Sequence, residues 1–176
     1  KDHLIGLLSK NGGKNLQFAQ QHVYWDDIIG MEATKKEVWE IITRIRDSRQ
    51  AKGSSNRLAR AYLFYGSPGT GKTHLIKAVA TETSFPVVPL YAPEVLAMTP
   101  PDARAELKRI FEEARSLSRT EMGCILYVSN VDVLVWNDTR MTFYDTVQNF
   151  FLSELDDMLS EKNNVFVFAE TTVGEE

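Results

Sequence analysis

The sequence has one cysteine, no long apolar run and no excess of basic residues, and each shortage excludes a class of protein. Cys124 is the only cysteine among 176 residues, so no disulfide can form within the chain. No stretch approaches the ~20 consecutive apolar residues that a membrane-spanning helix needs. The 20 Lys and Arg residues are outnumbered by 24 Asp and Glu residues, which argues against a dedicated nucleic-acid-binding protein. A hydrophobic content of 43% is instead sufficient for a globular domain with its own core.

The first 22 residues differ in character from the rest of the chain. They include Asn11-Gly12-Gly13-Lys14-Asn15, which is too polar and glycine-rich for a packed element. We interpret residues 1–22 as a linker or extension and residues 23–176 as the domain. Because the chain begins with Lys1 and not with Met, we expect it to be a piece of a longer protein, with any membrane anchor or further domain outside these residues.

Apolar runs alternate with helical patterns along the domain. The runs 61–65, 85–90, 125–128 and 165–169 are typical of buried strands, and amphipathic patterns predict helices over 34–46, 73–83, 102–117 and 142–159. Such alternation predicts an α/β fold with a mostly parallel sheet and helices on both faces. Cys124 borders one of the apolar runs, so we interpret it as a buried small hydrophobic residue.

Residues 66–73 read Gly-Ser-Pro-Gly-Thr-Gly-Lys-Thr and match the phosphate-binding pattern G-x-x-x-x-G-K-[ST]. The glycines let backbone N–H groups approach phosphate oxygens, and the helix that follows directs its positive dipole end to the same place. Lys72 is expected to neutralise the β- and γ-phosphates, and Thr73 to bind the Mg²⁺ that bridges them. His74 is either a surface residue or a group near the adenine or the phosphates. The candidate binding residues here are Ser67, Pro68, Gly69, Thr70, Gly71, Lys72, Thr73 and His74.

Residues 23–176 resemble the AAA ATPases. Residues 24–30, Tyr-Trp-Asp-Asp-Ile-Ile-Gly, look like the aromatic-x-D-[VI]-x-G signature of that family, and residues 78–82 and 106–114 are similar to its first two helices. The resemblance implies the three-layer P-loop NTPase fold of the AAA large subdomain, with the helical lid beyond Glu176. It also implies that the adenine pocket is lined by Asp27, Ile28, Ile29 and Gly30. Residues 85–89, 93–96 and 155–158 read most like membrane-anchored AAA proteases of the FtsH type.

Departures from the family pattern concern the groups that act on the γ-phosphate. AAA enzymes end the third strand with Asp-Glu-x-Asp, but this chain has Ser129 and Asn130 in the two carboxylate positions and keeps only Asp132. An asparagine can hold a water molecule but cannot accept its proton, and a serine supplies no charge to a metal. General-base catalysis is worth ~10²–10⁴ in rate, so we expect hydrolysis near background and weak Mg²⁺ binding. Thr172 replaces the sensor asparagine after the fourth strand.

A further departure lies before the second helix of the family pattern. Protein-threading AAA rings carry an aromatic residue there, whereas residues 97–102 read Ala-Met-Thr-Pro-Pro-Asp. We expect Pro100 and Pro101 to stiffen this loop, so that it does not grip a substrate chain.

These patterns predict a catalytically degenerate AAA subunit, or pseudoenzyme, that binds ATP or ADP with little hydrolysis. It would act structurally or as a regulator in a hetero-hexameric AAA ring for protein quality control, translocation or remodelling. The alternatives are an active ATPase in which Asp132, or a residue beyond Glu176, replaces the missing carboxylates, and a pure scaffold that leaves its loop empty. The implied partners are other AAA subunits and a protein substrate, without nucleic acid. The FtsH-type resemblance favours a membrane-associated complex in the chloroplast or mitochondrion, with the cytoplasm as the alternative.

Overall fold

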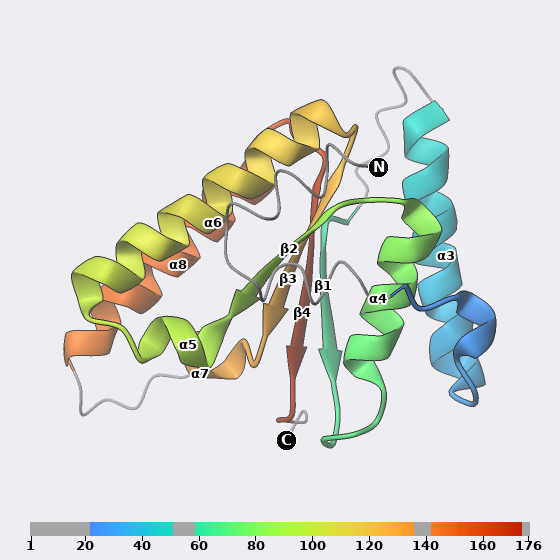
Figure 1. Cartoon of the computed structure of the whole chain (residues 1–176), viewed down its shortest axis with the longest axis horizontal. Coiled ribbons are helices and arrows are strands. Elements are labelled where there is room, and N and C mark those ends of the chain that lie inside the picture. The colour runs from blue at the N-terminus through green and yellow to red at the C-terminus, as the bar shows by residue number, and fades with distance from the viewer. Residues whose placement is uncertain (1–21, 51–58, 136–141, 174–176) are drawn as a thin grey trace.

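A parallel sheet divides the structure into two layers of helices (Figure 1). The computed structural model describes residues 22–50, 59–135 and 142–173. The four strands of these residues follow the order β1-β4-β3-β2 across the sheet, and every pairing is parallel. They are β1 (Ala61–Tyr65), β2 (Val87–Tyr91), β3 (Cys124–Ser129) and β4 (Val165–Thr171). The predicted α/β fold is therefore confirmed.

The helices cover the two faces of the sheet in separate groups (Figure 1). One face carries α3 (Glu32–Gln50) and α4 (Lys72–Thr83), preceded by a short 3-10 helix, η2 (Trp25–Asp27). The other face carries α5 (Ala92–Leu96), α6 (Pro100–Thr120), α7 (Asp132–Val135) and α8 (Thr142–Ser160). The predicted helices are present, and each begins or ends within a few residues of the expected position.

Strand β3 is buried on both faces because it lies inside the sheet. Its side chains alternate between the two cores: Ile125 and Tyr127 pack with α3 and α4, and Leu126 and Val128 pack with α6 and α8. This explains why the strand reads as a continuous apolar run and not as an alternating one. Cys124 is fully buried, as expected, and desolvation raises the pKa of its thiol.

Strand β1 lies at the edge of the described sheet and is paired there with β4. Its side chains alternate between partly buried and exposed. Leu63 and Tyr65 are 57% and 56% exposed, although Tyr62 stacks on Phe168 of β4 at 5.0 Å between ring centroids. The strand that leads into the phosphate loop is therefore held from one side.

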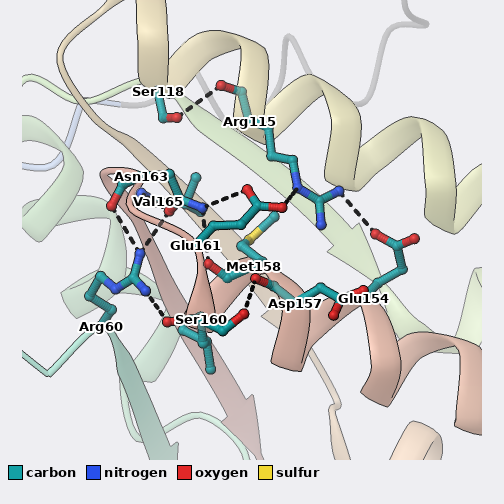
Figure 2. A network of polar contacts seen from close by, with 11 residues as sticks. Arg60, Arg115, Ser118, Glu154, Asp157, Met158, Ser160, Glu161, Asn163 and Val165 are labelled. Carbon is teal, nitrogen blue, oxygen red and sulfur yellow. Dashed lines mark hydrogen bonds and ion pairs between the residues drawn. The ribbon is translucent and has the colours of Figure 1, made fainter.

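A polar network lies at the amino end of the sheet, where β1 and β4 begin (Figure 2). Arg60 donates to the backbone and side-chain oxygens of Asn163 at 2.9 and 2.8 Å and to the carbonyl of Leu159. Asn163 in turn donates to Glu161 at 3.2 Å, and Glu161 forms an ion pair of 3.4 Å with Arg115 of α6. The network thus ties the residue before β1 to the turn between α8 and β4 and to α6.

The expectation that Pro100 and Pro101 stiffen a loop is wrong. Both prolines form the first turn of α6, and Thr99 occupies the position before it. Proline suits this place because the first turn of a helix has no intrahelical partner for its N–H groups. Thr99 Oγ1 also donates to Asp102 Oδ2 at 2.6 Å. The two short helices α5 and α7 were not predicted, and β2 begins at Val87 and not at residue 85.

Candidate nucleotide-binding site

The candidate site lies where β1, β3 and β4 end and α4 begins, at the lower end of the sheet in Figure 1. The carboxyl ends of parallel strands are the common location for ligands in α/β folds, because the loops that follow the strands converge there. The phosphate loop is one of these loops, since it connects β1 directly to α4. The topology therefore brings the ends of β3 and β4 close to the loop.

The backbone of the loop requires glycine at several points. Gly66, Gly69 and Gly71 have φ values of 140°, 77° and 91°, a region that other residues adopt at a cost. Gly71 immediately precedes α4, so the unpaired N–H groups of the first helical turn face the loop. Lys72 Nζ donates to the carbonyls of Gly66 and Ser67 at 2.7 and 2.9 Å, which places the ammonium group inside the loop.

A cavity of about 320 Å³ opens beside this loop. Its lining comes from the loop, from the start of α4 and from the ends of β3 and β4. The lining residues are Pro68, Gly69, Gly71, Lys72, Thr73, His74, Asn130, Glu170, Thr171 and Thr172. Most of the loop candidates thus surround one cavity together with Asn130 and Thr172. Ser67, Thr70 and Ser129 do not line it, and Thr70 Oγ1 donates instead to the carbonyl of Ser67 at 2.9 Å.

The four candidates before α3 do not line this cavity. Ile28 is buried and its carbonyl accepts from Lys35 Nζ at 2.8 Å, while Ile29 is 92% exposed. The segment nevertheless reaches the phosphate loop through the next residue, because a Cβ added to Gly71 would lie 3.2 Å from Cε of Met31. Asp27, Ile28, Ile29 and Gly30 stay predictions as adenine-pocket residues.

Glu170 is a site residue that the sequence interpretation missed. Its carboxylate lies in the lining, with Oε2 accepting from Thr73 Oγ1 at 2.8 Å and Oε1 accepting from Tyr127 OH at 2.6 Å. Burial, reinforced by this hydrogen bond to a carboxylate, raises the pKa of Tyr127. A signal was available, because Glu170 is the first charged residue after the apolar run of a strand whose carboxyl end meets the phosphate loop.

Glu170 and Ser129 lie at the same level on neighbouring strands. Tyr127 is paired with Phe168 and Val128 with Ala169, so Ser129 and Glu170 follow as the next pair. Side chains alternate along a strand, and Glu170 therefore faces the same side of the sheet as Tyr127 and Ser129, toward α4. A carboxylate thus lies one strand away from Ser129, the position at which the family pattern has an aspartate.

The segment after β3 turns away from the cavity at Asn130. This residue has a φ of 50°, which asparagine tolerates better than most residues. The next N–H, of Val131, donates to the carbonyl of Glu170 at 3.0 Å, so the turn is attached to β4. Asp132 then accepts a hydrogen bond of 2.6 Å from Thr171 Oγ1 and does not line the cavity.

Comparison with known proteins identifies the family. Residues 62–175 match the family described as "ATPase family associated with various cellular activities (AAA)". The chain belongs to the AAA family. The resemblance inferred from the motifs is confirmed at this level, and this AAA chain carries the intact phosphate loop together with the altered ends of β3 and β4.

Relatives of this AAA chain include several peroxisomal ATPases. It is 31% identical over 154 residues, 85% of its length, to the peroxisomal ATPase PEX6 of Candida glabrata, and 32% identical over 158 residues, 88% of its length, to pex6 of Schizosaccharomyces pombe. A putative cell division cycle ATPase of Plasmodium falciparum is 29% identical over 173 residues, or 96% of the chain. The chain spans only 15%, 16% and 14% of these three relatives.

Two expectations drawn from the FtsH-type resemblance change with these relatives. The expected chloroplast or mitochondrial location is wrong, because the similar PEX6 proteins are peroxisomal ATPases. The relatives also give the FtsH-type assignment and membrane association no support. Within the described ranges, no helix is both long and apolar enough to span a bilayer.

Solved structures of AAA domains share the fold. The FIGL-1 AAA domain in complex with ADP superimposes with a TM-score of 0.71 at 20% identity, over 85% of this chain and 49% of that one. A katanin structure, described as the structural basis for katanin self-assembly, superimposes with a TM-score of 0.67 at 24% identity, over 89% of this chain and 48% of that one. At these identities the likeness establishes the fold alone.

Proposed function

We propose that this AAA chain binds ATP or ADP in the cavity beside residues 66–73, hydrolyses it slowly or not at all, and serves as a structural or regulatory subunit in a ring of AAA subunits. Support for binding comes from Lys72, the left-handed glycines and the N-terminus of α4, which converge on one cavity. Such an arrangement suits phosphate groups because it offers backbone donors and positive charge together. Mg²⁺ would be held with the help of Thr73 and would supply positive charge that offsets the negative charge of the phosphates.

The observation that carries impaired hydrolysis is the position of Asn130. Asn130 lines the cavity, and the family pattern has at this position the glutamate that activates water. An amide can orient a water molecule but cannot accept its proton at neutral pH, and general-base catalysis is worth ~10²–10⁴ in rate. Thr172, which also lines the cavity, has replaced the sensor asparagine.

Nucleotide binding without turnover would still stabilise the subunit. A ligand that binds the folded state adds RT ln(1 + [L]/Kd) to its stability, or ~2.7 kcal/mol at a hundredfold excess over Kd. The family resemblance implies sites formed between neighbouring subunits, with arginines from the next subunit near the γ-phosphate. A permanently occupied site at such an interface would hold the ring together.

An active ATPase is the second candidate, and one observation favours it. Glu170 is an acidic residue of the cavity lining. Asp132 does not line the cavity, and its carboxylate accepts a hydrogen bond from Thr171. Single-turnover hydrolysis by the assembled complex separates the candidates. A rate well above background that disappears in Glu170→Gln would favour the enzyme, and a background rate in the wild type would favour the pseudoenzyme.

Equilibrium titration of a fluorescent ATP analogue, with the full-length protein in its complex, tests binding. Lys72→Ala removes a charged donor to phosphate worth about 1.5–3 kcal/mol, which corresponds to roughly 10- to 150-fold weaker binding. Lys108→Ala is the matched control, because Lys108 is an exposed lysine on α6. If neither wild type nor Lys72→Ala binds the analogue, the subunit is a scaffold with an empty loop.

The cellular location of this protein can be proposed from its similarity to the PEX6 proteins. We infer a peroxisomal role, because several similar proteins are peroxisomal ATPases. The test is the distribution of the full-length protein with a fluorescent tag in cells that carry a peroxisomal marker. Diffuse cytoplasmic signal with no enrichment at the marker would contradict this inference.

A further inference from the structure

We propose that Glu170 supplies, from β4, the metal-holding carboxylate that β3 lacks, so that nucleotide binding to this chain depends on Mg²⁺. The inference rests on the proposed function, since it concerns the cation that would accompany the nucleotide. It adds a residue role that the family pattern does not contain. Position 170 follows the apolar run of β4, while the family pattern places this carboxylate at the end of the third strand, here Ser129.

Glu170 is in contact with Thr73 of the phosphate loop. Thr73 Oγ1 is the expected cation ligand of the phosphate loop, and it donates to Glu170 Oε2 at 2.8 Å. Because the hydroxyl donates its hydrogen bond to the carboxylate, the lone pairs of the hydroxyl oxygen point elsewhere and can bind a cation. The pair therefore presents two kinds of oxygen, hydroxyl and carboxylate, at one side of the cavity.

Two hydrogen bonds hold the carboxylate of Glu170 in place. Oε1 accepts from the hydroxyl of Tyr127 at 2.6 Å, and Tyr127 is only 2% exposed. Both anchors, Tyr127 and Thr73, are neutral hydroxyl groups, so neither cancels the negative charge of Glu170. The charge remains available to a cation, and in the absence of a cation it repels the phosphates of a nucleotide.

The register of the sheet places Glu170 beside the position at which the family pattern has its carboxylate. Ser129 and Glu170 form the pair after Val128 and Ala169 and face the same side of the sheet. Neighbouring strands lie about 4.8 Å apart, so the carboxylate is displaced by one strand spacing and stays next to the start of α4. Its hydrogen bond to Thr73, the second residue of α4, shows that the displacement is small enough to reach the loop.

These oxygens fit the chemistry of Mg²⁺. The ion is usually held by one or two carboxylates together with the phosphates of a substrate. Within the described part of the chain, no group of three or more His, Cys, Asp or Glu residues gathers as a metal site. A cation beside Thr73 and Glu170 would thus need phosphate oxygens as further ligands, and we expect cation and nucleotide to bind together.

The experiment compares the affinity of a fluorescent ATP analogue in excess Mg²⁺ with its affinity in EDTA, using the full-length protein in its complex. We expect the wild type to bind at least about tenfold more tightly with Mg²⁺, as for a charge-assisted contact. Glu170→Gln keeps the size of the side chain but removes its charge. It should bring the ratio of the two affinities close to one, by weakening binding in Mg²⁺ and preserving or strengthening binding in EDTA.

Two further variants complete the design. Asp156→Asn removes one negative charge from an exposed position on α8 and should keep the wild-type ratio. Tyr127→Phe keeps the carboxylate but removes one of its anchors, so its ratio should lie between those of the wild type and Glu170→Gln. Electron paramagnetic resonance of Mn²⁺ in the presence of ADP gives a second readout. We expect Glu170→Gln to bind less Mn²⁺ than the wild type does.

The outcomes separate this inference from the proposed function. A wild-type ratio in Glu170→Gln, with unchanged Mn²⁺ binding, overturns the role of Glu170 and leaves nucleotide binding intact. A loss of hydrolysis in that variant without any change in the Mg²⁺ dependence of binding would assign Glu170 as a base and also overturn the inference. Absence of nucleotide binding by the wild type in both conditions overturns the proposed function itself.

Discussion

The two ends of the sheet use their polar residues in opposite ways. At the amino end, the guanidinium of Arg115 forms ion pairs with the carboxylates of Glu154 and Glu161 (Figure 2). At the carboxyl end, the ammonium of Lys72 and the carboxylate of Glu170 form hydrogen bonds with neutral carbonyl and hydroxyl groups of the described residues, and both residues line a cavity.

The difference separates stability from binding. Charges that neutralise each other hold secondary elements together, and they have little capacity left for a ligand. Charges held by neutral hydroxyls or carbonyls keep their field, so they can attract phosphate or a cation. We therefore expect substitutions at the amino end to change the free energy of unfolding, and substitutions at the carboxyl end to change binding and turnover.

The largest effect is expected for Asn130→Glu, which restores a potential base in the cavity lining. Single-turnover hydrolysis in the assembled complex should rise by ~10²-fold or more, in line with the usual contribution of general-base catalysis. The variant should also lose about 1 kcal/mol of stability, because glutamate adopts the positive φ of residue 130 less readily than asparagine does. Asn149→Glu, exposed on α8, is the control. An unchanged rate would mean that something other than the missing base limits hydrolysis.

Arg115→Ala tests whether the ion pairs at the amino end of the sheet contribute to the free energy of unfolding. Arg115 is 15% exposed and forms an ion pair of 2.9 Å with Glu154, itself 19% exposed. Its loss leaves a largely buried carboxylate without a partner, and we expect about 1–3 kcal/mol less stability in urea unfolding. Lys108→Ala breaks an exposed pair on the same helix and should cost less than about 1 kcal/mol. Altered nucleotide affinity in Arg115→Ala would contradict the separation of the two ends.

Gly71→Ala should change both the free energy of unfolding and the affinity for nucleotide, because the backbone of the loop contributes to both. Residue 71 has a φ of 91°, and a side chain there costs about 1–2 kcal/mol. The added Cβ would lie 3.2 Å from the flexible end of Met31, which can move aside. We expect a lower free energy of unfolding together with weaker binding of the ATP analogue. Loss of stability with unchanged affinity would show that the loop adapts without its left-handed glycine.

The smallest effect concerns pH and Cys124, at the amino end of β3. Burial, followed by the nearby Glu113, raises the pKa of this thiol above its ordinary value of 9.0. The folded thiol keeps its proton while the unfolded thiol loses it, so the unfolded state binds fewer protons and stability falls as pH rises above 9. Between pH 8 and pH 10 the wild type should lose about 1 kcal/mol relative to Cys124→Ala. Parallel pH profiles for the two proteins would refute this assignment.

Patterns local in sequence predicted most of the fold. Strand β1 and the phosphate loop were placed correctly because an apolar run, glycines and a lysine stand in one continuous segment. Helices α5 and α7 were missed since five and four residues are too few to show a helical period. The misplaced role of Pro100 came from reading a proline pair as a loop, although the first turn of a helix accepts proline equally well.

The candidate site was predictable only in part. Loop residues such as Lys72 and Thr73 carry their own motif, whereas Glu170 acquires meaning through the pairing of β4 with β3. That register depends on segments far apart in the chain, and a single sequence does not state it. The expected location failed for another reason, because it was taken from a resemblance to one branch of a family whose members share their motifs.

The pairing of β1 with β4 has a consequence for how the chain folds during synthesis. Arg60 contacts Asn163, 103 positions later, and among the described strands β1 pairs with β4, residues 165–171. At 5–20 residues per second, a ribosome needs about 5–20 s to make the intervening segment. Throughout that interval β1 lacks the partner with which it pairs in the described sheet. Contacts between such distant segments also slow folding, so we expect nucleotide binding beside the ends of β3 and β4 to follow the entry of β4 into the sheet.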